Sequence, residues 1–263
     1  MLRMCPTIRD PSCTVQFLEM TRDFVRISDW DLMQIHVSAL YRHDDRNRLL
    51  AVNEPGDPRP DDPPPPRLFL GRTRAGHLWQ FRHDVAESLA AELESLLATE
   101  PVGADISRPP GCLEALQATL LQHGQITGTW SGPAWRFPDG IPAPDHEVIP
   151  VTMATVDLVR PAFPSLADDL PWCQPCVAIV ADGRLASLCF SSRNTPIAAE
   201  AGVNTLEEFR GRGYAPAVVA AWGQAVRAEG RIPLYSTSWD NLASRSVARK
   251  LGLVLYGADF SIE

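Results

Sequence analysis

The sequence has little that would place the protein in a membrane or on a nucleic acid. No stretch approaches the ~18 consecutive apolar residues that a membrane-spanning helix needs. The formal net charge is −8, from 24 basic and 32 acidic side chains, so the basic footprint of a nucleic-acid binder is missing. The first residues also lack the apolar core and cleavage site of a secretory signal. We therefore expect a cytoplasmic protein with no nucleic acid and no membrane as partners.

The six cysteines lack a pattern that would indicate a metal site or a disulfide scaffold. Cys173 and Cys176 have C-x-x-C spacing, but a zinc site would need two more ligands in a similar cluster. A thioredoxin-like site would need a helix at the first cysteine, whereas a strand is predicted to begin after the second. The chain is also long and lacks a secretion signal. We expect two reduced thiols at a strand entrance, and no metal.

Two common phosphate-binding motifs are absent as well. No Gly-Lys-Ser/Thr occurs, and Pro216 stands where the dinucleotide fingerprint has its third glycine after Gly211 and Gly213. What is present is a predicted strand at 198–205, this glycine turn, and a helical apolar face over 218–226. The first N–H groups of a helix have no partner inside it, and glycines let a bulky anion approach. This order therefore predicts a phosphate site.

The residues of the turn point to a family. Arg210 to Ala215, Arg-Gly-Arg-Gly-Tyr-Ala, resembles the R/Q-x-x-G-x-G/A signature of the GNAT superfamily of acetyl-CoA-dependent N-acyltransferases. A second predicted strand, 232–237, follows the helix. Asn241 and Ser244, with Ala-Arg-Lys-Leu-Gly-Leu at 248–253, are similar to the family's second signature, N-x-x-(A/S) with a K-L-G-F-like ending. Two signatures in this order and spacing form a specific match.

The resemblance covers roughly residues 146–263. It implies an α/β (α+β) fold, with a GNAT-like mixed, mostly antiparallel twisted sheet flanked by helices. Residues 1–140 are predicted to form an additional α+β domain of unknown role. The patterns of this first part predict helices at 28–41, at 84–96 with Asp84 as cap, and at 111–123, strands at 68–73, 77–82 and 125–137, and an exposed proline-rich insertion at 53–66.

One strand that the family usually has is missing from the C-terminal half. A hairpin is predicted around Asp182-Gly183, and the last predicted strand runs from Leu253 to Ile262, where the family would add a seventh. We expect that an N-terminal strand or a partner subunit supplies it. A homodimer is therefore a possible assembly.

The resemblance implies that an amine attacks the thioester of acetyl-CoA directly. In the family, the strand before the glycine loop splays from its neighbour and binds pantetheine through its backbone, which carries over to Val203, Asn204 and Thr205. The loop would hold the pyrophosphate through its backbone N–H groups and two cationic side chains, at Arg210, Gly211, Arg212, Gly213, Tyr214 and Ala215. Asn241 matches the pantetheine-contacting asparagine, and Ser244 lies one turn further on.

The attacking amine must lose a proton, and a carboxylate can accept it, often through a water. Glu200 is the candidate base because it lies on the predicted central strand, where many family members have a glutamate. Alternatively it orients the substrate or meets solvent. Ala248 stands where many members have the tyrosine that protonates the leaving thiolate. Either Tyr235, Tyr256 or Ser246 replaces it, or the thiolate leaves unaided, or the chemistry has been lost.

Two functions follow. The first is transfer of an acetyl group from acetyl-CoA to a primary amine of a small molecule or protein. The second is a catalytically silent CoA-binding sensor or structural module. The resemblance implies acceptor walls from 155–172, the last strand and the N-terminal half. Asp157, Asp168 and Asp169 in the first of these favour a cationic amine, and a hydrophobic or peptide acceptor stays open.

Overall fold

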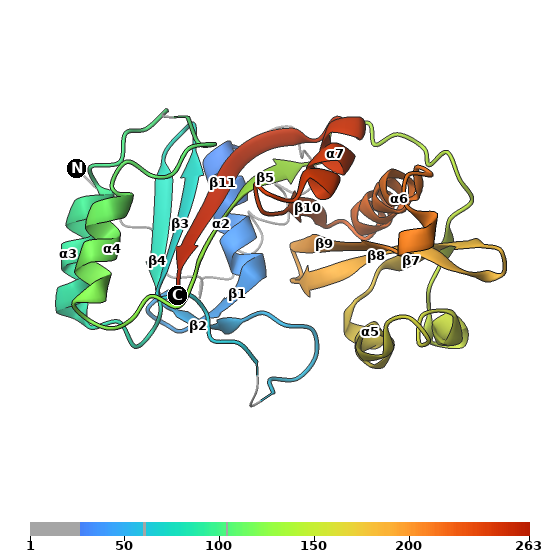
Figure 1. Cartoon of the computed structure of the whole chain (residues 1–263), viewed down its shortest axis with the longest axis horizontal. Helices are drawn as coiled ribbons and strands as arrows, with labels where there is room; N and C mark the ends of the chain where they lie inside the picture. The colour runs from blue at the N-terminus through green and yellow to red at the C-terminus, as the bar shows by residue number, and fades with distance from the viewer. Residues whose placement is uncertain (1–26, 60–61, 104) are drawn as a thin grey trace.

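The structure, a computed structural model, describes residues 27–59, 62–103 and 105–263. Within these ranges nine strands form one sheet in the order β4-β3-β11-β5-β10-β9-β8-β7-β6, and β1 pairs with β2 separately (Figure 1). The strands are β1 (Tyr41–His43), β2 (Leu49–Val52), β3 (Leu68–Thr73), β4 (His77–Phe81), β5 (Thr129–Arg136), β6 (Ile149–Pro150), β7 (Cys176–Ala181), β8 (Arg184–Asn194), β9 (Ala198–Thr205), β10 (Ile232–Ser236) and β11 (Val254–Ile262). All neighbours are antiparallel except β9 and β10. The expected mixed, mostly antiparallel sheet is confirmed.

Helices cover both faces of the sheet, and strand alternation decides which helix meets which residue. Leu68 and Leu70 pack with α3 and α4, whereas Phe69 between them packs with α2. In the same way, Ala199 faces α6 and Ala198 faces α2. The helices are α2 (Asp29–Leu40), α3 (Glu87–Leu97), α4 (Leu113–Leu121), α5 (Pro164–Asp169), α6 (Tyr214–Ala228) and α7 (Leu242–Lys250), with 3₁₀ turns η2 (Met153–Leu158), η3 (Leu170–Trp172) and η4 (Glu207–Phe209). In the described ranges, no helix has the length and apolarity to cross a membrane.

Strand β5 supplies the strand that the C-terminal half lacks. It lies between β10 and β11 and is antiparallel to both, with Tyr235 opposite Trp135 and Phe260 opposite Ser131. Figure 1 shows β5 in green beside the red β11. Of the two expected sources, the N-terminal half therefore provides the strand. One sheet runs through both halves of the chain, and a domain boundary near residues 140–146 stays a prediction.

Two predicted helix starts have different outcomes. Ser28, where the first helix was predicted to begin, caps α2, with its Oγ accepting from the N–H of Asp31 at 3.1 Å. The prediction that Asp84 caps a helix is wrong. Its carboxylate accepts from Nε of Arg82 at 2.7 Å, and α3 begins only at Glu87. A nearby cation thus takes the oxygen that was expected to bind backbone N–H groups.

The proline-rich segment is tied to the rest of the protein at its start. The Asn53 side chain donates to the carbonyls of Ala39 and Asn194, at 2.9 and 3.1 Å. Glu54 accepts from Arg193 of β8 at 2.6 Å. Residues 60 and 61 lie outside the described residues. These contacts link the segment to both halves, which is more than a tolerated surface insertion would need.

Candidate active site

The two parallel strands β9 and β10 separate partway along their length. They pair at three positions, of which Glu200 opposite Leu234 is the last. Beyond it, β9 continues to Thr205 paired only with β8, and β10 continues to Ser236 paired with β5. Two strand edges therefore diverge from Glu200 onward. This is the splay that the GNAT resemblance implies.

Backbone direction along β9 shows which predicted residues face the opening. The N–H of Leu206 donates to the carbonyl of Ala186, so Leu206 points its backbone toward β8. Alternation then turns the backbone groups of Val203 and Thr205 to the open edge. The Asn204 carbonyl accepts from Ser187 Oγ of β8 at 3.1 Å, so only its exposed side chain remains for a ligand.

The glycine loop lies at the end of the same strand. Gly211 and Gly213 adopt left-handed backbone angles, φ 79° and 83°, which favour glycine. Gly213 is the N-cap of α6, and no side chain caps that end. The loop residues 210–213 are exposed, while Tyr214 and Ala215 are half-buried in the first turn. The uncapped N–H groups and the positive end of the helix dipole suit an anion.

The two loop arginines are held by residues that come just before the loop. Nε of Arg210 donates to the Thr205 carbonyl at 3.4 Å, and Nη2 of Arg212 donates to the Glu208 carbonyl at 3.2 Å. The Arg212 guanidinium also lies 5.2 Å from the ring centre of buried Phe209. Both cations are thereby kept beside the uncapped helix end.

Asn241 and Ser244 lie at the start of α7. The Asn241 side-chain oxygen accepts from the Ser244 N–H at 3.0 Å and so caps the helix. The Ser244 carbonyl accepts from the Tyr235 hydroxyl at 3.3 Å. Asn241 is exposed, so its amide group remains accessible to a ligand from solvent.

Glu200 belongs to a buried polar cluster, and the exposed fraction of Glu200 is 4%. Ser236 Oγ donates to its Oε1 at 2.8 Å, and Nε2 of His36 lies 3.7 Å from its Oε2. The same Nε2 lies 3.6 Å from Oδ2 of Asp259. The Tyr256 hydroxyl lies 2.7 Å from Nδ1 of His36. Four elements, α2, β9, β10 and β11, thus meet around one imidazole.

Comparison with known proteins agrees with the loop and strand geometry. The model of the GNAT acetyltransferase family matches residues 176–258. The GNAT resemblance is confirmed. The matched segment contains Glu200, the glycine loop, Asn241 and Tyr256, and it ends one residue before Asp259. His36 lies far outside it.

Solved structures give only distant similarity, and no curated protein matches. A GCN5-related N-acetyltransferase-like protein from Streptococcus suis is 16% identical, with 80% of this chain and 89% of that chain covered and a TM-score of 0.46. A Drosophila protein is 14% identical, with 96% of each chain covered and a TM-score of 0.49. A putative GNAT acetyltransferase from Novosphingobium aromaticivorans is 19% identical, with 52% and 66% covered and a TM-score of 0.44.

Burial shifts the pKa values of the acidic and basic side chains in the cluster around His36. It raises the pKa of Glu200 to about 7, while the bond from Ser236 and the charge of Arg193 oppose the rise. It lowers the pKa of His36 to about 3, so the imidazole is neutral at pH 7. Burial, and then the charge of Glu200, raise the pKa of Asp259 well above its ordinary value. Near neutral pH, Glu200 thus exists in both its protonated and its ionised form.

The structure separates the two candidate tyrosines. Tyr235 packs in the core under α6, and burial raises its pKa. Tyr256 lies on the other side of the sheet, under α2, where burial raises its pKa as well. Only Tyr256 joins the cluster around Glu200. Ser246, the third candidate, lies on α7 and accepts from Arg249 at 3.3 Å.

The sequence did not indicate His36, Ser236 or Asp259. His36 lies on an otherwise apolar face of α2, and Asp259 interrupts the apolar last strand, which is the one signal that each offered. A polar residue in an apolar pattern has many explanations. The partners of His36 in this cluster are all more than 150 residues away in the chain, so local spacing could not have predicted these contacts.

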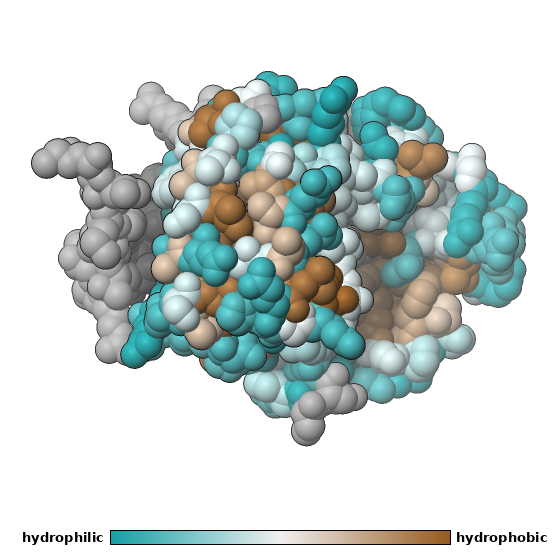
Figure 2. Space-filling model, turned by 60° about the vertical axis from the view of Figure 1, so that its left-hand side comes forward, coloured by the Kyte–Doolittle hydropathy of each residue, from teal (hydrophilic) through white to brown (hydrophobic). Residues whose placement is uncertain are grey.

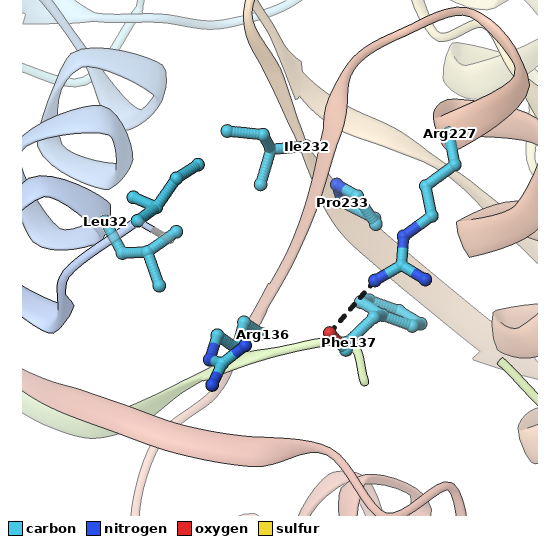
Figure 3. A pocket seen from close by; sticks show the side chains of 7 residues that line it. Leu32, Arg136, Phe137, Arg227, Ile232 and Pro233 are labelled. Carbon is cyan, nitrogen blue, oxygen red and sulfur yellow. Dashed lines mark hydrogen bonds between the residues drawn. The ribbon is translucent and has the colours of Figure 1, made fainter. Parts of the chain in front are cut away.

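The remaining candidate features lie apart from this site. Cys173 and Cys176 are free and buried, and burial raises the pKa of both thiols to about 12. No group of side chains in the described ranges could hold a metal ion. A small recess at the start of β10 is lined by Ile27, Leu32, Arg136, Phe137, Arg227, Ile232 and Pro233 (Figure 3). It lies at the opposite end of β10 from the opening.

The charges at the predicted acceptor wall are partly neutralised. Asp168 accepts from Arg160 at 2.6 Å, and Asp169 pairs with Arg59. Asp157 lies in η2. Figure 2 shows a hollow with hydrophobic walls toward the right of the view, bordered by hydrophilic residues.

Proposed function

We propose that the protein is an N-acetyltransferase that moves an acetyl group from acetyl-CoA to a primary amine in a ternary complex. The observation that carries the proposal is the position of Glu200. It is the last residue of β9 that pairs with β10, so a group with a pKa of about 7 lies where the two strands separate. The glycine loop begins five residues after the end of the same strand, at Arg210.

The cofactor would lie along this opening. Pantetheine would bond to the outward backbone groups of Val203 and Thr205, and the exposed side chains of Asn204 and Asn241 would border it. The pyrophosphate would bind the N–H groups of the loop and first helical turn, from Gly211 to Ala215, with Arg210 and Arg212 adding positive charge. Ser244 contributes by fixing the start of α7.

Glu200 would act as the general base. An ammonium ion has no lone pair, so the amine must pass a proton to the carboxylate before or during attack on the thioester carbonyl. The nitrogen–carbon bond then forms, the carbon–sulfur bond breaks, and CoA leaves as a thiolate. The second proton that the nitrogen gives up as the amide forms passes to this thiolate or to water. A base with a pKa near the working pH is efficient in this role.

The leaving thiolate needs no tyrosine donor in this proposal. The hydroxyl groups of Tyr235 and Tyr256 are bonded to the Ser244 carbonyl and to His36, and Ala248 is buried in α7. A thiol has a pKa of about 8.5, so its thiolate is a stable leaving group near neutral pH. We therefore expect Tyr235→Phe to retain most of the turnover.

Thiol release with a panel of amines tests the proposal. Glu200→Gln should lower turnover by roughly 10²–10⁴-fold while acetyl-CoA affinity stays within a few fold. Glu207→Gln, at an exposed carboxylate of the turn, is the matched control and should behave as wild type. Normal turnover of Glu200→Gln would refute the base assignment. Tight acetyl-CoA binding without thiol release on any amine would favour the silent CoA-binding module.

A further inference from the structure

Helix α2 brings the N-terminal half into direct contact with the candidate base. A methyl group added at Gly71 of β3 would lie 2.5 Å from Met33 Cγ, and one at Gly257 of β11 would lie 2.5 Å from Met33 Cε. Both glycines thus let Met33 pack closely against the sheet. His36 lies one turn after Met33 on the same face of the helix, which directs its ring to Glu200.

The hydrogen bond between Tyr256 and Nδ1 favours one tautomer of this imidazole. Burial raises the pKa of Tyr256, so its hydroxyl keeps its proton and can donate to Nδ1 of His36. Nε2 then carries the ring proton and faces Oε2 of Glu200 and Oδ2 of Asp259. At 3.6–3.7 Å these contacts are electrostatic, and they lie where solvent is excluded.

Among the residues that the structure describes, Arg193 of β8 is the cation whose charge lowers the pKa of Glu200, and that arginine is paired with Glu54. The charge of Glu200 contributes to raising the pKa values of Cys189 of β8 and Tyr235 of β10, but both side chains pack on the α6 side of the sheet.

On the α2 side of the sheet, the described groups that face Glu200 are therefore His36 and the two β11 residues next to it, Tyr256 and Asp259. Among the described residues, neither Nε2 of His36, Oε2 of Glu200 nor either carboxyl oxygen of Asp259 has a hydrogen-bond partner. These buried atoms converge on one point, so each depends on the others.

We propose that His36 is a positioning residue for the catalytic base, holding Oε2 of Glu200 through its Nε2–H beside the carboxyl group of Asp259. The inference rests on the proposed function, and it assigns the N-terminal half a part in it. When Glu200 is ionised, the Nε2–H dipole stabilises its charge. When Glu200 accepts the proton of the amine, that stabilisation is lost, so His36 sets how readily the carboxylate takes up a proton.

Two readouts test the proposal. The first is the titration of the Glu200 carboxyl carbon, followed by NMR in the free protein without substrate. The second is the acidic limb of the pH profile of kcat/KM. His36→Leu removes the donor, so both should move to higher pH by about one unit, which lowers kcat/KM about tenfold below the limb. His36→Gln restores an N–H donor and should return both to within a few tenths of a unit.

Matched variants separate this role from simple packing. His43→Gln changes a half-buried histidine outside the cluster, bonded to Gln80, and should move neither readout. Tyr256→Phe frees Nδ1 and should give a smaller upward shift of the same sign. If His36→Leu does not fold, His36→Gln and Tyr256→Phe still give the comparison.

Two results overturn parts of the account separately. A folded His36→Leu protein that is less stable but keeps the wild-type titration of Glu200 would show that His36 only fills the core. A wild-type protein that acetylates no amine would refute the proposed function, while the NMR titration would still decide whether His36 controls Glu200.

Discussion

The glycine loop and the cluster around His36 are the two ends of one candidate site, and they are built in different ways. The loop is local and exposed: strand, turn and helix follow each other from 198 to 228. The cluster is buried and joins α2, β9, β10 and β11, elements that the fold alone brings together. Residues that are contiguous in sequence can carry a signature, whereas residues that only the fold brings together carry none.

The strongest test of this contrast is the pH dependence of stability. The pKa of Glu200 is raised from 4.5 to about 7, so between these values the folded state holds a proton that the unfolded chain loses. Stability should fall as pH rises through this window, by about 3 kcal/mol in total. The pKa of His36 is lowered from 6.5 to about 3, so its contribution rises with pH from 3 to 6.5.

Burial also raises the pKa of Asp259, so its contribution, like that of Glu200, falls as the pH rises. From pH 4.5 to 6.5 the rising contribution of His36 opposes both carboxyl groups. Relative to wild type, the slope of stability against pH in this range should be more positive in Glu200→Gln and more negative in His36→Gln, each by roughly 1.4 kcal/mol per pH unit. Guanidinium unfolding at several pH values measures both. Parallel curves for all three proteins would contradict the titrations assigned to the cluster.

The packing of α2 on the sheet gives a smaller effect. Gly71→Ala places a methyl group against Met33 and should lower the free energy of unfolding by about 1–3 kcal/mol. Gly140→Ala adds a methyl group with no neighbour within 4 Å and should be nearly neutral. Equal stabilities of the two variants in denaturant unfolding would mean that α2 has room to move.

The smallest expected effect on stability comes from substituting Asn241, which lies at the exposed end of the candidate site. Asn241→Ala removes the cap of α7 and should lower stability by about 1 kcal/mol, whereas Asn241→Asp keeps an oxygen at the cap. Both variants lose the side-chain amide and should bind acetyl-CoA more weakly. Thermal unfolding and calorimetric binding separate the two roles. Unchanged binding in both variants would remove Asn241 from the cofactor site.

Particular residues show how far the sequence could predict this structure. Gly213 and the helix after it were predictable because a positive φ and an apolar helical face are properties of neighbouring residues. Glu200 was predicted from the family pattern, but its hydrogen bond to Ser236 was not. The place of β5 was open between two sources, because strand pairing across the sheet leaves no mark in local spacing. Asp84 was misassigned since Arg82 competes for its carboxylate.

The central claim is that the loop from Gly211 to Ala215 holds acetyl-CoA, and calorimetric titration tests it most directly. Gly213→Ala and Gly230→Ala place a side chain at similar backbone angles, φ 83° and 75°, but only Gly213 lies in the loop. The account predicts that wild type and Gly230→Ala bind acetyl-CoA with similar affinity, and that Gly213→Ala binds at least tenfold more weakly. No binding by folded wild-type protein, or equal binding by both variants, would contradict it.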